Sequence, residues 1–209
     1  MAQRIGRPDR HHALPRRFAA VLVATALTTT GCQGMAMTPS DSKLPRTVEA
    51  HDTVADWPLR FHQHNFGIAC YAVQKCSIFY SNLWHNRDVR PAREDVHPNA
   101  LNATSASHVG ILNFPEPALV RWSSRDGTPF EVEVDIGDIF KDRLIRHRTP
   151  REDIKEGVSI LNPDVLLEVN DRTINVYMRA FLPTKELQIP GNQYSGHRDD
   201  LVLVWSRTY

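Results

Sequence analysis

Residues 118–134 read ALVRWSSRDGTPFEVEV, and this stretch decides the fold. Two short apolar runs, 118–122 and 129–134, lie on either side of a polar segment that contains Asp126 and Gly127. An Asp-Gly pair tolerates the positive φ angles that tight turns between antiparallel strands require. The stretch therefore predicts a β-hairpin.

The second strand of this hairpin alternates apolar and acidic residues, in the sets Phe130, Val132, Val134 and Glu131, Glu133, Asp135. This period predicts one buried face and one wet face. Three carboxylates on one rigid face would suit docking of a partner protein. Acid–base chemistry by carboxylates that raise one another's pKa is an alternative, and a merely solvated face is the plainest interpretation.

Further strand signals lie on both sides of this hairpin. Residues 165–182 predict a second hairpin around Asn170-Asp171, with Ile174, Val176, Met178 and Ala180 on one face. Residues 57–66 alternate until Asn65-Phe66-Gly67, and residues 77–84 and 201–205 (LVLVW) complete the strand candidates. We expect 201–205 to be a central strand because it is apolar throughout.

Helical signals are weak by comparison. Residues 136–142 are long enough for about one helical turn, and no long apolar stripe of helical period occurs. The sequence predicts a mainly β fold, an antiparallel sandwich or curled sheet with at most short helices.

The N-terminus predicts export. Five arginines precede the apolar run Phe18–Leu27, and small residues lead to Gly31-Cys32. The run is too short to cross a bilayer. The Gly-Cys ending is similar to a lipobox, so we expect cleavage before Cys32 and acylation of its thiol, although Thr29 stands where the motif usually has Leu. Cleavage near Ala36 without lipidation is the alternative. The residue after the cysteine is Gln33 rather than Asp, and the resemblance to lipoprotein sorting in Gram-negative bacteria implies an outer-membrane protein that faces the periplasm.

The predicted organisation is a signal peptide (1–31), a lipid-anchored tether (32–56) and one globular domain (57–209). Residues 1–31 hold five Arg and one Asp, so their removal changes the formal charge from +1 to −3. A mildly acidic domain argues against nucleic acid as the main partner.

Cys70 and Cys76 would then lie in an oxidising compartment. Their C-x5-C spacing is neither a C-x-x-C redox motif nor a usual zinc knuckle, so we predict a structural disulfide.

The sequence offers little for catalysis. No G-x-S-x-G, P-loop, G-x-G-x-x-G or H-E-x-x-H motif occurs, and we expect no enzyme activity and no cofactor. His62 and His64 would share one strand face, with His85, His97 or His108 as a third metal ligand. We expect no metal there, because two ligands are too few, and predict a wet strand face instead. An enzyme with an unfamiliar site remains open.

A long polar loop over residues 86–108 is the best candidate for partner contacts outside the acidic strand. Aromatic and arginine anchors dominate many protein interfaces. The loop and the strand before it supply Trp84, His85, Arg87, Arg90 and Arg93. The alternative is a solvated loop.

Three stretches together resemble a known group: the lipobox, residues 122–140, and the strand-turn-strand run 166–180. The chain is similar to small lipoproteins that serve as immunity proteins beside type VI secretion phospholipase effectors. The resemblance implies a periplasm-facing protein that binds and neutralises a lipase; it supplies no inhibitory residue. A structural or accessory lipoprotein of a secretion or outer-membrane assembly is the alternative.

Overall fold

The computed structural model describes residues 52–96 and 100–209. Eleven strands and one α-helix form in this part of the chain, with three 3-10 turns at Val54–Asp56, Arg93–Asp95 and Arg151–Asp153. The strands and helix are β1 (Gln63–Tyr71), β2 (Val73–Tyr80), β3 (Leu83–Asn86), β4 (His108–Leu112), β5 (Ala118–Ser124), β6 (Pro129–Val134), α1 (Ile136–Ile139), β7 (Asp164–Asn170), β8 (Thr173–Arg179), β9 (Leu182–Pro183), β10 (His197–Arg198) and β11 (Leu201–Thr208).

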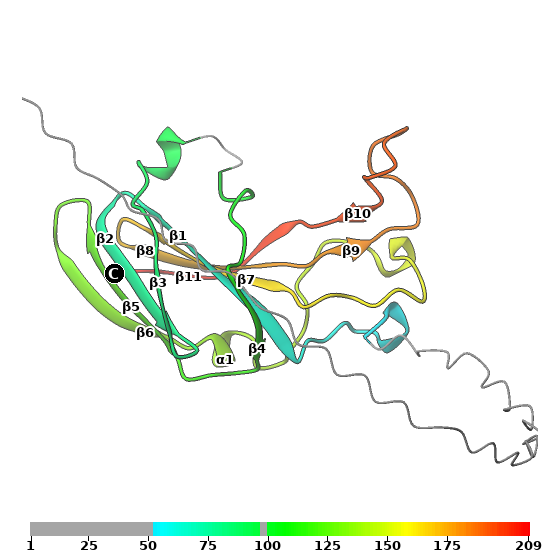
Figure 1. Cartoon of the computed structure of the whole chain (residues 1–209), viewed down its shortest axis with the longest axis horizontal. Helices are drawn as coiled ribbons and strands as arrows, with labels where there is room; N and C mark the ends of the chain where they lie inside the picture. The colour runs from blue at the N-terminus through cyan, green and yellow to red at the C-terminus, as the bar shows by residue number, and fades with distance from the viewer. Residues whose placement is uncertain (1–51, 97–99) are drawn as a thin grey trace, which may run out of the picture. The chain divides into compact units, whose positions relative to one another are not determined.

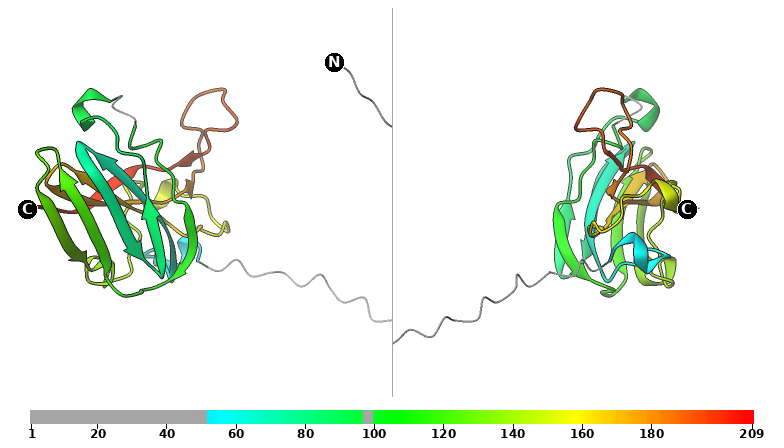
Figure 2. Two further views of the ribbon diagram at one scale, coloured as in Figure 1. Left: turned by 60° about the vertical axis from the view of Figure 1, so that its left-hand side comes forward. Right: turned by 90° about the vertical axis from the view of Figure 1, so that its right-hand side faces the viewer.

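Two sheets form a sandwich (Figures 1 and 2). The five-stranded sheet has the order β11-β8-β7-β1-β4, and the four-stranded sheet has the order β3-β2-β5-β6. Strands β9 and β10 pair separately. Among the described strands only β1 and β7 pair in parallel. The predicted mainly β, antiparallel sandwich is confirmed, and the one described α-helix spans four residues.

The core fills the space between the inner faces of the two sheets. Alternation places Val165, Leu167, Ile174 and Val176 inward from one sheet, and none of them is solvent-exposed. Ile78, Val120 and Val134 face them from the other sheet, which joins the two layers in one apolar cluster. The predicted inward set 174, 176, 178 and 180 is buried as expected.

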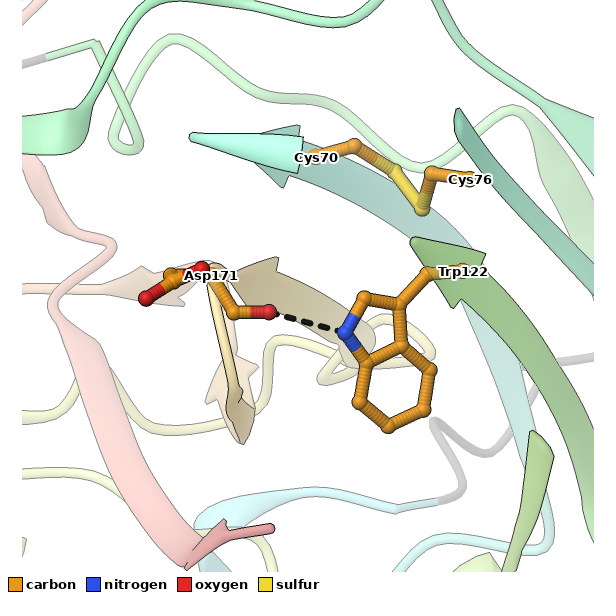
Figure 3. Close-up of a disulfide and its surroundings, with 4 residues drawn as sticks. All are labelled: Cys70, Cys76, Trp122 and Asp171. Carbon is orange, nitrogen blue, oxygen red and sulfur yellow. Dashed lines mark hydrogen bonds between the residues drawn. A yellow bond between two sulfur atoms is a disulfide. The ribbon is translucent and has the colours of Figure 1, made fainter. Parts of the chain in front are cut away.

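A single residue turns the chain from one sheet to the other. Ala72, with φ +50°, separates β1 from β2, and β1 and β2 belong to different sheets. The Cys70–Cys76 disulfide spans this corner, as predicted (Figure 3). It links the C-terminal end of β1 covalently to β2, across the sandwich.

The tips of the two predicted hairpins also hold the sheets together. The Trp122 indole N–H donates to the backbone carbonyl of Asp171 at 2.8 Å (Figure 3). The Asp171 carboxylate accepts from the Arg125 backbone N–H, and Arg172 pairs with Asp126 at 2.6 Å. Hydrogen bonds from Ser124, Thr128 and Arg172 hold the pKa of Asp126 well below its usual range.

The predicted long loop lies against the five-stranded sheet. We call its described residues, 87–96 and 100–107, the strap. Arg90 pairs its backbone with β1, and the Arg93 guanidinium lies 3.1 Å from the fully buried Glu168 carboxylate on β7. Leu101 packs in a second apolar cluster with Tyr71 and Tyr177, on the face of the sheet that points away from the main core.

Gly67 shows how close the strap lies. A Cβ atom at this position would be 2.9 Å from the Ser105 carbonyl oxygen and from the Ala106 Cα atom, and 2.8 Å from Leu166. Only glycine allows this approach of two backbones. The strand break predicted at Asn65-Phe66-Gly67 is therefore wrong: β1 continues to Tyr71, with a register shift between His64 and Phe66.

Three other predictions need correction. Residues 77–84 are not one strand, because Ser81 and Asn82 both have positive φ and turn β2 back into β3. The apolar β11 is an edge strand with Leu203 51% exposed, not a central one. The predicted tether ends too late, since Val54 is buried in the core.

The predicted signal peptide and Cys32 lie outside the described residues. No helix in residues 52–96 and 100–209 is long and apolar enough to cross a membrane.

Removing the disulfide should lower stability without changing the fold. The Cys70→Ser/Cys76→Ser variant should lose about 2 kcal/mol of unfolding free energy, because a short closed loop restricts the unfolded chain only modestly. Urea unfolding, monitored by Trp fluorescence, measures the difference. Wild-type protein in dithiothreitol should match the variant; equal stability of oxidised and reduced wild type would contradict the prediction.

Breaking the ion pair under the strap should cost more. Arg93→Met leaves the buried Glu168 carboxylate without its cation, and we expect a loss of about 3 kcal/mol. Adding Glu168→Gln should recover part of the loss, because the neutral amide needs no counter-charge. A double mutant as unstable as Arg93→Met would show that the strap depends on arginine for other reasons.

Candidate protein-binding face

The outer surface of the four-stranded sheet carries several of the residues predicted to bind a partner. We call this surface the open face (Figure 2). Strand register places Trp84, Phe79, Leu119 and Glu133 in one row across β3, β2, β5 and β6. The neighbouring row contains Arg121 opposite Glu131.

Trp84 is the centre of a contact network on this face. Trp84 is 44% exposed, and its ring lies 5.2 Å from the Phe79 ring, centre to centre. The Arg121 guanidinium lies 5.5 Å from the Trp84 ring centre, within the range of a cation–π contact. Arg121 Nε also lies 2.7 Å from Glu131 Oε2. The aromatic ring, cation and carboxylate are thereby held in fixed positions while each remains accessible.

A shallow groove of about 390 Å³ lies beside this network. Lys75, Arg121 and Glu131 line it with charges. Exposed ion pairs contribute little to the stability of a fold. The Arg121–Glu131 pair is therefore better placed to give a partner orientation and specificity than to hold the sheet together.

The predicted acidic row is only partly present. Glu131 and Glu133 project from the open face, but Asp135 lies beyond the end of β6. The Asp135 carboxylate accepts from the Asp138 backbone N–H at 2.9 Å and caps α1. The expectation that all three carboxylates share one strand face is wrong for Asp135, because the chain turns into the helix there.

The predicted arginines are distributed between surface and interior contacts. Arg87 is exposed just after β3. Arg90 donates to the Tyr71 hydroxyl at 3.2 Å, and Arg93 donates to Glu168 and to the Tyr177 hydroxyl. Arg90 and Arg93 thus fix the strap to the sheet, a role that the sequence pattern does not distinguish from partner binding.

His85 points inward rather than to the surface. It is 6% exposed, its ring centre lies 5.0 Å from that of Phe66, and it stacks on His108 at 5.6 Å. His85 Nε2 and His108 Nδ1 are buried and have no hydrogen-bond partner among the described residues. Burial and the nearby His108 lower the pKa of His85. This histidine pair closes the edge of the sandwich between β3 and β4, directly behind Trp84.

His64 is also buried, so the predicted wet face is wrong at this position. Asn113 Nδ2 donates to the Phe61 carbonyl, which leaves its Oδ1 to accept from His64 Nδ1 at 2.7 Å. His64 Nε2 then accepts from the Tyr80 hydroxyl at 2.9 Å. Burial lowers the pKa of His64 and raises that of Tyr80. Both ring nitrogens of His64 are therefore hydrogen-bonded. Because His64 is on β1 and Tyr80 is on β2, these bonds suit a structural link between the two sheets.

The histidines do not assemble a metal site in the described residues. His62 is exposed whereas His64 is buried, and no group of three or more His, Cys, Asp or Glu side chains in 52–96 and 100–209 could hold an ion. His97 lies outside the described residues.

Sequence reasoning missed Phe79, Arg121 and Leu119 as members of the open face. Alternation within residues 118–122 contains part of the signal, since Leu119 and Arg121 must share a face opposite Ala118 and Val120. Phe79 could not be placed beside them, because pairing between β2 and β5 joins residues about 40 positions apart.

Comparison with protein-family models, with curated proteins and with solved structures finds no match for this chain.

Acid should destabilise the domain. Burial lowers the folded-state pKa of His64, His85 and His147, so below about pH 6.5 the unfolded chain binds protons that the folded chain does not. The unfolding free energy should therefore be highest above pH 7 and fall as the pH decreases toward 5. Urea unfolding at pH 7.5, 6.5 and 5.5 measures the trend.

His85→Asn should reduce this pH dependence, because it removes one of the buried imidazoles. His62→Gln is the matched control, since the His62 side chain is exposed. A pH dependence equally steep in His85→Asn and wild type would exclude His85 as a contributor.

Proposed function

We propose that this chain is an exported lipoprotein whose β-sandwich binds a protein through the open face, and that the bound protein is a type VI secretion phospholipase effector. The domain neutralises the effector by covering its substrate entrance and performs no chemistry of its own. The observation that carries the binding role is the accessible Trp84–Arg121–Glu131 network beside a groove.

The residue types of the open face and the fixed positions of their side chains favour binding to a protein. Tryptophan and arginine contribute most to protein interfaces when they are held in place before binding. Phe79 supports Trp84, and Glu131 orients Arg121, so little side-chain freedom is lost on association. The charges of Lys75, Glu131 and Glu133 around this centre would fix the orientation of the partner.

The proposed location follows from the N-terminal sequence. Acylation of Cys32 would anchor the chain in the outer membrane, and the following segment would carry the domain in the periplasm. The Cys70–Cys76 disulfide fits that oxidising compartment. The lipase as partner rests on the resemblance of residues 122–140 and 166–180 to immunity lipoproteins. An accessory role in an envelope assembly would use the same open face with a different partner.

Capture from the source strain distinguishes these roles. Residues 33–209 would be immobilised with the disulfide intact, and retained proteins identified by mass spectrometry. A retained phospholipase is then assayed on vesicles of phosphatidylethanolamine and phosphatidylglycerol with increasing amounts of the domain. Stoichiometric inhibition supports the immunity role, whereas retention of assembly components alone supports the accessory role.

Substitutions on the open face test which surface binds. Trp84→Ala should weaken the affinity for the captured phospholipase by about 30-fold, the size of a binding hot spot. Arg121→Ala should weaken it by about tenfold. Isothermal titration calorimetry measures both. Leu161→Ala is the matched control, because it removes an apolar side chain that is 61% exposed outside the open face. Unchanged affinity in Trp84→Ala would remove the open face from the interface.

A further inference from the structure

A loop at the end of a β-ribbon presents a second surface. We call residues 184–196, between β9 and β10, the finger. Pro183 pairs with His197 and Leu182 with Arg198, so two strands support its base. Figure 1 shows β9 and β10 running outward beyond the ends of β8 and β11, with the finger beyond them.

Large apolar side chains are exposed along the finger. Tyr194 is 78% exposed, Ile189 57% and Leu187 45%. Tyr194 is the most exposed large hydrophobic side chain in the part of the chain that the structure describes. Isolated exposed apolar residues are common, but three within eight positions on a projecting loop indicate a contact surface.

Hydrogen bonds around Ser195 hold the finger in one conformation. The Ser195 side chain is buried, accepts from the Ile189 N–H at 3.0 Å and lies 2.8 Å from the Asn192 carbonyl oxygen. The Gln188 N–H donates to the Ser195 carbonyl, and Thr184 N–H donates to that of Gly196. A loop ordered in this way loses little entropy on binding.

The tip of the finger, residues 187–196, is uncharged. Residues 187–196 contain no Asp, Glu, Lys, Arg or His. The nearest cations on either side are already paired, Lys185 with Glu156 at 3.2 Å and Arg198 with Asp200 at 2.6 Å. Binding to an anionic membrane surface depends on Lys and Arg around the apolar contact. The uncharged tip of the finger therefore fits an apolar cleft in a protein better than it fits lipid headgroups.

We propose that the finger inserts into the acyl-chain-binding cleft of the phospholipase; this inference rests on the proposed function. A lipase must have an apolar site for the hydrocarbon chains of its substrate. Tyr194 and Ile189 would occupy that site and exclude lipid. The open face then supplies affinity, and the finger supplies occlusion.

Inhibition of the captured phospholipase tests this division. Hydrolysis of phosphatidylethanolamine–phosphatidylglycerol vesicles is measured with wild type, Tyr194→Ser, Ile189→Ser and the control Gln193→Ser, which changes an exposed polar residue of the same loop. The two apolar substitutions should raise the half-inhibitory concentration at least tenfold, and Gln193→Ser should leave it within twofold.

Ser195→Ala separates conformation from contact. It keeps Leu187, Ile189 and Tyr194 but removes the side-chain hydrogen bonds that order the loop. We expect the half-inhibitory concentration to rise threefold to tenfold. Near-UV circular dichroism and the melting temperature of each variant verify that the sandwich remains folded.

Each outcome decides a different question. Suppose that wild type inhibits the phospholipase and that the Tyr194→Ser and Ile189→Ser variants have the same half-inhibitory concentration as wild type. The role of the finger is then overturned, while the proposed function stands. If these two variants keep inhibition but lose flotation with the same vesicles, the finger binds membrane instead, which also overturns the inference. If wild type inhibits no captured phospholipase, both proposals fall together.

Discussion

The whole sandwich depends on one turn of the chain. With only Ala72 between them, β1 and β2 enter different sheets, and the Cys70–Cys76 disulfide fixes this corner. Strand β1 then lies between β7 and β4, and β2 lies between β3 and β5. Every later strand of the two large sheets is added to one of these two, directly or through a neighbour. The position of the open face relative to the core therefore follows from the corner.

Burial of Glu168 explains why the strap has an ordered path. A fully buried carboxylate needs compensation, and strands β7 and β8 supply only neutral hydrogen-bond donors from Asn175 and Tyr177. Arg93 brings the cation from a segment 75 residues earlier in the chain. Since this ion pair holds the strap against one sheet, that sheet is covered on both faces. The other sheet keeps an outer face available for binding.

Local patterns predicted the elements whose partners are close in sequence. The hairpins at 118–134 and 164–179 were predicted correctly because alternation and an Asp-Gly or Asn-Asp turn specify both strands at once. The position of β11 was predicted wrongly. Leu201 on its outer side packs near Tyr177, and Trp205 on its inner side packs against the core. This edge strand therefore has the apolar composition of a central strand. Trp84 was singled out for its residue type. Phe79 pairs with it across the β2–β3 turn, which the sequence did not predict, and Arg121 joins it only through the long-range pairing of β2 with β5. The finger has no strand or motif signal, because its order comes from Ser195 hydrogen bonds.

In both proposed contact surfaces, the residues that hold the backbone in place are buried behind the side chains that would contact a partner. Trp84 is carried by β3, which the buried His85 holds at the sandwich edge, and Tyr194 projects from a loop centred on Ser195. Exchanging Trp84 or Tyr194 would thus change what the surface binds with little effect on the backbone that presents it. An inhibitor that must match one particular enzyme benefits from this separation, because its specificity can change while the corner at Ala72 and the Glu168–Arg93 pair keep the fold.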